Sequence, residues 1–246
     1  MTAPHPAKFN DPILFVIAEM IDDEIFAGDG PKSGTFRQFN VLDPFAGTGR
    51  VHELDTFRPA GAAQSPLNTR GIELEPEWAE MHPRTEQGDA LDMVNVPAAW
   101  ADIVATSPTY GNRMADHHDA KDGSKRMTYR HQLGRPLHEN NSGKMAWGPK
   151  YWEFHEDAWT EVNRVLAPGG MFIINTKDFI RTKRIKKRPV RETVGVTSWH
   201  LELLAAMGYS VIRHERIPVK GMGFGANGKN RVGHEDVVAL RKPARK

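Results

Sequence analysis

Apolar residues recur along the chain with two different spacings, which predict two kinds of element. Helical spacing is found in 13–26, 76–81, 154–166 and 197–207. Short strands are predicted in 39–43, 69–74, 101–106, 171–175, 210–219 and 236–241, and the third of them is continuously apolar in Ile103-Val104-Ala105. Because the strands alternate with helices, the pattern predicts an α/β fold. We expect a mostly parallel sheet of about seven strands with helices on both faces.

The segment between residues 111 and 150 interrupts this alternation. It is rich in His, Arg, Asn and Gly, and it has few apolar residues with which to form a core. Loops of this length are rarely mere connections. We therefore expect a single domain spanning 1–246, in which 111–150 is an insertion that contacts the target.

Composition excludes several classes of protein. The chain has 246 residues, 39% of them hydrophobic and 26% charged, as in soluble globular proteins. No apolar run reaches the roughly 18 residues that a membrane span needs, and the N-terminus does not resemble a signal peptide. The absence of cysteine excludes disulfides and thiolate chemistry. We expect a cytoplasmic protein with no membrane partner and no metal.

Cations are concentrated in one short segment, although the net charge of +2 is nearly balanced. Between residues 181 and 191 there is no acid, and the basic residues are Arg181, Lys183, Arg184, Lys186, Lys187, Arg188 and Arg191. Such a run is either a solvated loop or a loop that binds a polyanion.

A glycine turn directly follows the first predicted strand. Its sequence is Asp43-Pro44-Phe45-Ala46-Gly47-Thr48-Gly49. The two glycines let the backbone turn tightly and approach a ligand at the carboxyl edge of the sheet. The third glycine of a dinucleotide-binding turn is missing, which counts against an NAD-dependent dehydrogenase and favours a nucleoside without phosphates.

Two acids follow at positions suited to that nucleoside. Glu73 ends the second strand, where a carboxylate accepts hydrogen bonds from both ribose hydroxyls in dinucleotide sites. Asp89, in Gly88-Asp89-Ala90, precedes the third strand and suits an adenine amino group.

The glycine turn resembles the cofactor motif of class I S-adenosylmethionine-dependent methyltransferases, in the form typical of DNA amino-methyltransferases. The resemblance implies a Rossmann-like fold and S-adenosylmethionine as cofactor. It implies that Asp43 faces the methionine ammonium, that Glu73 holds the ribose and that Asp89 holds the adenine. The cofactor contacts that it implies are Phe9, Asn10, Asp43, Phe45, Ala46, Gly47, Thr48, Gly49, Glu73, Leu74, Asp89, Ala90 and Ser107. For Phe9, and for the apolar helix that follows it, a plain core role is the simpler interpretation.

Thr106-Ser107-Pro108-Thr109-Tyr110 follows the third strand at the same edge. It resembles the Thr-Ser-Pro-Pro-Tyr motif of enzymes that methylate exocyclic amino groups, which implies catalytic roles for Ser107, Pro108 and Tyr110. An aromatic amine is a poor nucleophile, because its lone pair is delocalised into the ring. Acceptors on Ser107 Oγ and the Pro108 carbonyl would free that lone pair, and Tyr110 would stack on a base flipped out of the duplex.

Two features of this motif qualify the resemblance. The second proline of the family is Thr109 here, and losing its fixed φ makes the turn less rigid. Serine at the first position favours N4-cytosine slightly over N6-adenine.

DNA is the expected partner, and the residues expected to contact it lie in the insertion and in the basic run. They are Arg113, Arg126, Arg130, Arg135, Lys183, Arg184, Lys186, Lys187 and Arg188. Three alternatives stay open: an RNA methyltransferase, a protein-glutamine methyltransferase, and a nucleoside-binding protein without turnover. The sequence does not distinguish a monomer from a homodimer.

Overall fold

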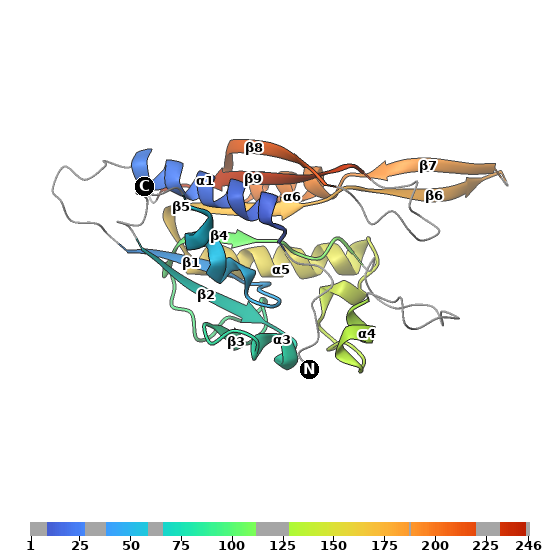
Figure 1. Cartoon of the computed structure of the whole chain (residues 1–246). Coiled ribbons are helices and arrows are strands. Elements are labelled where there is room, and N and C mark those ends of the chain that lie inside the picture. Colours follow the sequence, from blue (N-terminus) through green and yellow to red (C-terminus); the bar gives the residue numbers. More distant parts are fainter. Residues whose placement is uncertain are drawn as a thin grey trace.

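The computed structural model describes residues 9–27, 38–58, 66–111, 128–186, 188–219 and 232–244. Its centre is a seven-stranded sheet with the strand order β3-β2-β1-β4-β5-β9-β8 (Figure 1). The strands are β1 (Phe39–Asp43), β2 (Leu67–Glu73), β3 (Thr85–Gln87), β4 (Ala101–Thr106), β5 (Leu166–Thr176), β8 (Ser210–Pro218) and β9 (His234–Arg241). This confirms the predicted α/β fold and its sheet of seven strands.

Strand direction explains where a ligand would bind. Strands β1 to β5 pair in parallel, and β9 alone runs antiparallel to both of its neighbours. The chain runs outward from β1 through β2 to β3 and then returns to β4 on the other side of β1. The strand order therefore reverses between β1 and β4. In open α/β sheets, ligands bind beyond the carboxyl ends of the strands at such a point.

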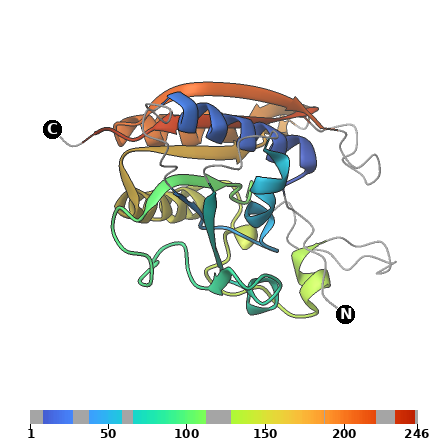
Figure 2. The ribbon, with the colours of Figure 1, turned by 60° about the vertical axis from the view of Figure 1, so that its left-hand side comes forward.

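Helices cover both faces of the sheet (Figure 2). They are α1 (Asp11–Ala27), α2 (Leu54–Phe57), α3 (Pro76–Ala79), α4 (Tyr129–Leu133), α5 (Pro149–Val165) and α6 (Val196–Ala206), with the 3-10 helices η1 (Arg50–Glu53) and η5 (Ser142–Lys144). Within the described residues, no helix is long and apolar enough to cross a membrane.

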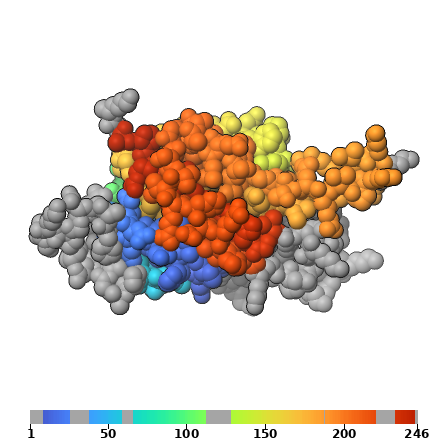
Figure 3. Space-filling view, turned by 90° about the horizontal axis from the view of Figure 1, so that it is seen from above, coloured from blue at the N-terminus to red at the C-terminus, as the bar shows by residue number. Residues whose placement is uncertain are grey.

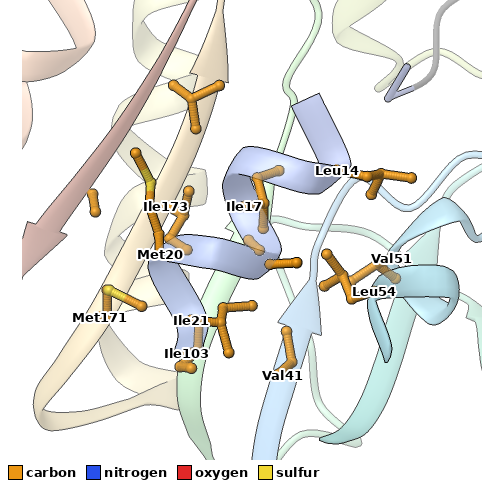
Figure 4. Close-up of a cluster of buried hydrophobic side chains, with 14 of the residues drawn as sticks. Leu14, Ile17, Met20, Ile21, Val41, Val51, Leu54, Ile103, Met171 and Ile173 are labelled. Carbon is orange, nitrogen blue, oxygen red and sulfur yellow. The ribbon is translucent and has the colours of Figure 1, made fainter. Parts of the chain in front are cut away.

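One face of the sheet is covered by α1, η1 and α2. Leu14, Ile17 and Ile21 of α1 are fully buried, and Figure 4 shows the α1 side chains packed beside β1, β4 and β5. The other face packs against α5 and α6 in a second cluster. Val41 lies in the first cluster and its neighbour Leu42 in the second. Such alternation explains why the strands are apolar at successive positions.

The basic run forms a β-hairpin rather than the expected loop. Strands β6 (Phe179–Ile185) and β7 (Arg188–Val194) pair with each other in a separate antiparallel sheet. The hairpin extends away from the body of the molecule (Figures 1 and 3). Cations interrupt its apolar residues and most of its side chains are exposed, so it lacked the buried apolar pattern from which the other strands were predicted.

The boundaries of the predicted elements lie within two residues of the prediction, except at the starts of α5 and β5, and the short helices α2 and α4 were not predicted. Helix α5 begins at Pro149 rather than at residue 154, with the proline in its first turn. Strand β5 begins at Leu166 rather than at residue 171, and it continues through Gly169 and Gly170. The register between β4 and β5 shifts at this point, and the three-residue edge strand β3 was not predicted.

Candidate active site

The glycine turn lies directly after β1 and packs against β2. Gly47 and Gly49 have φ values of 52° and 81°, which favour glycine. A Cβ on Gly49 would lie 2.8 Å from the Cβ of His82, and a Cβ on Gly71 would lie 2.7 Å from the Cβ of Ala46. The backbone of the turn is therefore held close to the end of β2, and side chains are excluded from both positions.

Glu73 lies against this turn. Its Oε2 accepts a hydrogen bond from the Gly47 N–H at 2.8 Å, and its Oε1 accepts one from the Glu75 N–H at 2.9 Å. Burial raises the pKa of Glu73 to about 7, although the two N–H donors oppose the shift. The predicted ribose-binding acid is thus next to the glycine turn, and its carboxyl group gains or loses a proton near neutral pH.

Asp43 joins β1 to β4 where the strand order reverses. Its Oδ1 accepts hydrogen bonds from Thr106 Oγ1 at 2.6 Å and from the Phe45 N–H at 3.0 Å. Burial raises the pKa of Asp43 to about 7. The glycine turn and the turn after β4, which were predicted to bind the cofactor and the target, are therefore brought together by this contact.

Asp89 lies between the sheet edge and the insertion. Its Oδ1 accepts a hydrogen bond from the Leu91 N–H, and its Oδ2 accepts one from Asn140 Nδ2 at 2.9 Å. Ala90 beside it is buried, and Leu74 is half-buried. The insertion therefore contacts the acid that was predicted to bind adenine.

The predicted contacts before α1 and in the middle of the turn have structural roles in this fold. Phe9 is buried in the core beside α1, and Asn10 Oδ1 accepts a hydrogen bond from the Ile13 N–H at the start of α1. Phe45 packs against Phe154 and Trp159 of α5. The positions of Phe9 and Asn10 thus agree with the core interpretation and do not add support for a cofactor contact.

The turn after β4 contains a chain of hydroxyl groups. Ser107 Oγ lies 2.9 Å from Tyr110 Oη, and Tyr110 Oη donates to Asn175 Oδ1 at 3.3 Å. Asn175 Nδ2 donates to the Asp236 carbonyl, which fixes the direction of the amide. Because the Tyr110 proton is directed to Asn175, Ser107 donates to Tyr110. The remaining lone pairs of Ser107 Oγ then serve as acceptors.

Tyr110 keeps its proton in this arrangement. Burial, the nearby Glu235 charge and other tyrosines raise its pKa well above the ordinary value, and the hydrogen bond with Ser107 opposes the shift. Asn175 was not predicted to take part in the site, because it lies within an apolar strand of the sequence. Only the parallel pairing of β4 with β5 brings it beside Tyr110.

The described part of the insertion has a small core, built from the few apolar residues of this segment. Tyr129 and Leu137 pack on Trp78 of α3, with Met81 and Leu133 beside them. A cluster this small is sufficient to hold the segment against the sheet edge.

Polar contacts strengthen that attachment. The fully buried Glu75 accepts hydrogen bonds from the His138 N–H and from Asn141 Nδ2. Arg135 forms ion pairs with Glu75, at 2.8 Å, and with Glu77. Arg135 thus anchors the insertion, whereas Arg130 lies exposed on α4. The other predicted arginines of the insertion, Arg113 and Arg126, lie outside the described residues.

The hairpin exposes the cations of the basic run. Lys183, Arg184, Lys186 and Arg188 are all exposed, and Lys187 lies outside the described residues. Arg181 and Lys183 form ion pairs with Glu192, the first acid after the run. No ion pair of Arg184 or Arg191 is found in the described part of the chain.

No protein-family model and no curated protein matches the chain. Solved structures do resemble it. A SAM-dependent methyltransferase from Methanosarcina mazei is 10% identical with a TM-score of 0.50, covering 85% of this chain and 94% of that one. The Burkholderia thailandensis 1,6-didemethyltoxoflavin-N1-methyltransferase is 18% identical with a TM-score of 0.46, covering 95% and 80%.

A structure described as a candidate DNA modification methylase from Thermus thermophilus, complexed with S-adenosyl-L-methionine, is 17% identical. Its TM-score is 0.39, and the match covers 65% of this chain and 55% of that one. At these identities the likeness shows the fold alone. The chain has the Rossmann-like α/β fold of SAM-dependent methyltransferases.

Proposed function

We propose that the protein transfers the methyl group of S-adenosylmethionine to the exocyclic amino group of a base in DNA. The observation that carries this proposal is the position of Ser107. Its Oγ lies at the carboxyl end of β4, and the contact between Thr106 and Asp43 brings that end beside the glycine turn. An acceptor for an amine N–H and a turn suited to a nucleoside are therefore neighbours.

The residues around the glycine turn fit this cofactor. A nucleoside without phosphates needs acceptors for its hydroxyls rather than a cluster of donors, and Glu73 and Asp89 are such acceptors. Glu73 Oε2 is already fixed by the Gly47 N–H, so its free lone pairs have a defined direction. When bound, S-adenosylmethionine supplies a methyl group that is activated by its sulfonium charge.

The chain's own residues act on the amine. Ser107 Oγ and the Pro108 carbonyl accept its two N–H bonds, which draws the nitrogen towards tetrahedral geometry and frees its lone pair. With the cofactor bound, that lone pair would form the new C–N bond as the C–S bond breaks, and the electrons of the C–S bond would stay on sulfur. One amine proton then leaves to water. Positioning of this kind contributes effective molarities of roughly 10^5–10^8 M.

The hairpin favours nucleic acid over protein as the target. Facing residues of an antiparallel pair lie on the same face, so Thr182 and Arg191 share a face with Arg184. On this face the two arginines are exposed and have no ion pair within the described residues. Unpaired cations on an extended ribbon are typical of phosphate contacts.

The opposite face of the hairpin is partly neutralised. Arg181 faces Glu192 across the ribbon, and Lys183 binds the same carboxylate. A two-stranded ribbon also has the width that the major groove of DNA admits. We therefore assign duplex contact to the face with Arg184 and Arg191, and Ser107 rather than an acid favours cytosine as the base.

The test is to identify the product. The protein is incubated with labelled S-adenosylmethionine and with duplex DNA, RNA or bulk protein, and the nucleic acids are digested to nucleosides for mass analysis. We expect an N4-methylcytosine or N6-methyladenine nucleoside from DNA, and far less of it in the same time with the Ser107→Ala variant as the control. Label found only in RNA or in protein would overturn the choice of DNA. No transfer to any of the three, despite cofactor binding, would indicate a binding protein.

A further inference from the structure

Buried groups hold Thr109 from two sides. Thr109 lies between Pro108 and Tyr110 in the turn after β4. Its carbonyl accepts a hydrogen bond from Tyr151 Oη of α5 at 2.7 Å, and its Oγ1 lies 2.7 Å from Ser142 Oγ of η5. The exposed fraction is 0% for Tyr151 and 3% for Ser142. One residue of the turn is thus fixed both to the helix beneath it and to the insertion.

The Tyr151 hydroxyl is directed at Thr109 by a second buried pair. Trp159 Nε1 only donates, and it donates to His200 Nδ1 at 3.0 Å. Burial, together with the nearby His155, lowers the pKa of His200 well below its ordinary value, so the ring is neutral. Its proton therefore lies on Nε2, which donates to Tyr151 Oη at 3.1 Å. Tyr151 in turn donates its own proton to the Thr109 carbonyl.

Ser142 is fixed from the cofactor side of the sheet. Asn141 Oδ1 accepts a hydrogen bond from the Gly143 N–H and so caps η5, which begins at Ser142. Asn141 Nδ2 donates to Glu75 Oε1 at 2.8 Å, and Glu75 follows the end of β2. A short path of hydrogen bonds thus leads from the glycine-turn side of the site to Thr109.

The position of Thr109 determines the direction in which the carbonyl group of Pro108 points. The Pro108 carbonyl and the Thr109 Cα lie in one planar peptide unit, so holding Thr109 holds that carbonyl. The ring of Pro108 restricts only its own φ, and the φ of Thr109 is free unless contacts fix it. Each residue left free in the turn would have to be ordered at the moment of reaction.

We propose that Thr109 is a positioning residue, and that Ser142 and Tyr151 hold it so that the Pro108 carbonyl accepts an N–H of the target amine. This inference rests on the proposed function for the identity of the amine. The hydrogen bonds compensate for the absence of a ring at position 109.

The first test compares Thr109→Val, which removes the hydroxyl, with the conservative Thr109→Ser. Thr109→Val and Ser142→Ala should each lower kcat about five- to tenfold, the effect of one hydrogen bond. The affinity for S-adenosylmethionine should stay unchanged, and Thr109→Ser should retain the parental rate. Thr109→Val combined with Ser142→Ala should be no worse than either alone, because both break the same bond.

A separate pair of variants compares the contact of Tyr151 with the Thr109 carbonyl and the contact of Ser142 with Thr109 Oγ1. Tyr151→Phe combined with Ser142→Ala should lower kcat more than either change alone, because these side chains hold different atoms of Thr109. A double variant no slower than the slower single variant would contradict the two-sided hold. Equal kcat values in Thr109→Val and the parental protein would overturn the inference, and so would additive losses in Thr109→Val with Ser142→Ala.

Amide hydrogen exchange tests the same contact without turnover. Residues 107–111 should exchange faster in Thr109→Val and Ser142→Ala than in Thr109→Ser, while α1 keeps its protection. Unchanged exchange in this segment would overturn the inference even if the protein is an active methyltransferase. Conversely, a parental protein that transfers no methyl group, but shows these exchange differences, would overturn the proposed function and leave the role of Thr109 in place.

Discussion

The carboxyl edge of the sheet and the β6–β7 hairpin place polar groups in opposite ways. At the edge, carboxyl and hydroxyl groups are buried or half-buried and each has a named partner, as Glu73 has the Gly47 N–H. On the hairpin, Arg184 and Arg191 are exposed, with no ion pair in the described part of the chain. A buried group acts through its position, whereas an exposed cation acts through its charge. Substitutions at the edge should therefore change one step strongly, and substitutions on the hairpin should change binding in small increments.

The largest effect is expected at Ser107. Ser107→Ala removes an acceptor that matters most as the amine becomes tetrahedral, so the single-turnover rate should fall by about 100-fold or more, as for other preorganised groups at a reacting centre. The affinity for S-adenosylmethionine should change far less than the rate, because Ser107 is only one of many implied cofactor contacts. Tyr110→Phe, which keeps the ring but removes the hydroxyl, is the matched control and should have a smaller effect. A parental rate in Ser107→Ala would place the chemistry elsewhere.

Glu73 should have the next largest effect, and it should be on binding alone. Glu73→Ala removes a charged acceptor for the ribose hydroxyls, and such hydrogen bonds contribute roughly 1.5–3 kcal/mol. Calorimetry should show S-adenosylmethionine binding that is about 10- to 100-fold weaker. Glu80→Ala, at the exposed end of α3, is the control. Equal affinities for the two variants would exclude Glu73 from the cofactor site.

The same carboxyl group predicts a pH dependence of binding. The pKa of Glu73 is raised to about 7, and the carboxylate is the better acceptor, so binding should favour the deprotonated form. The affinity for S-adenosylmethionine should therefore increase from pH 6 to pH 8 and level off above. One group accounts for at most about tenfold per pH unit. Glu73→Gln should flatten the profile. Any pH dependence of the affinity that remains in this variant should come from Asp43, which has a similar pKa.

The hairpin should have the smallest effect per residue. The double variant Arg184→Gln with Arg191→Gln should lower the magnitude of the slope of log affinity for duplex DNA against log salt by about 1.8. Each lost phosphate contact contributes about 0.9 to that slope. Arg181→Gln with Lys183→Gln changes the net charge equally on the other face. It should alter the slope less, because Glu192 already pairs with both cations. Equal slopes for the two double variants would mean that net charge alone, rather than one face, binds DNA.

Features encoded by neighbouring residues were predictable from the sequence. The turn from Asp43 to Gly49 and the strands on either side of it need only local patterns, and the structure has them at the expected positions. The small core of Tyr129 and Leu137 was missed, because its partner Trp78 lies on a distant segment. Asn175 was missed for the same reason, since strand pairing rather than spacing brings it to Tyr110.

The hairpin was missed for a different reason. Strands are recognised by apolar residues that pack on a core, and β6 and β7 have no core beneath most of their length. Their pairing is fixed by the ladder itself, with Ile185 opposite Arg188 at the tip. A run of cations does not distinguish such a ribbon from a loop.

The hairpin leaves the fold and returns to it at almost the same point. Phe179 faces Val194 at its base, so the two ends of the excursion are one strand spacing apart, about 5 Å. A short turn would connect β5 to α6 without disturbing the sheet order. The ribbon is thus a replaceable module, and exchanging it for another hairpin would be a direct way to give the same catalytic edge a new preference for its target.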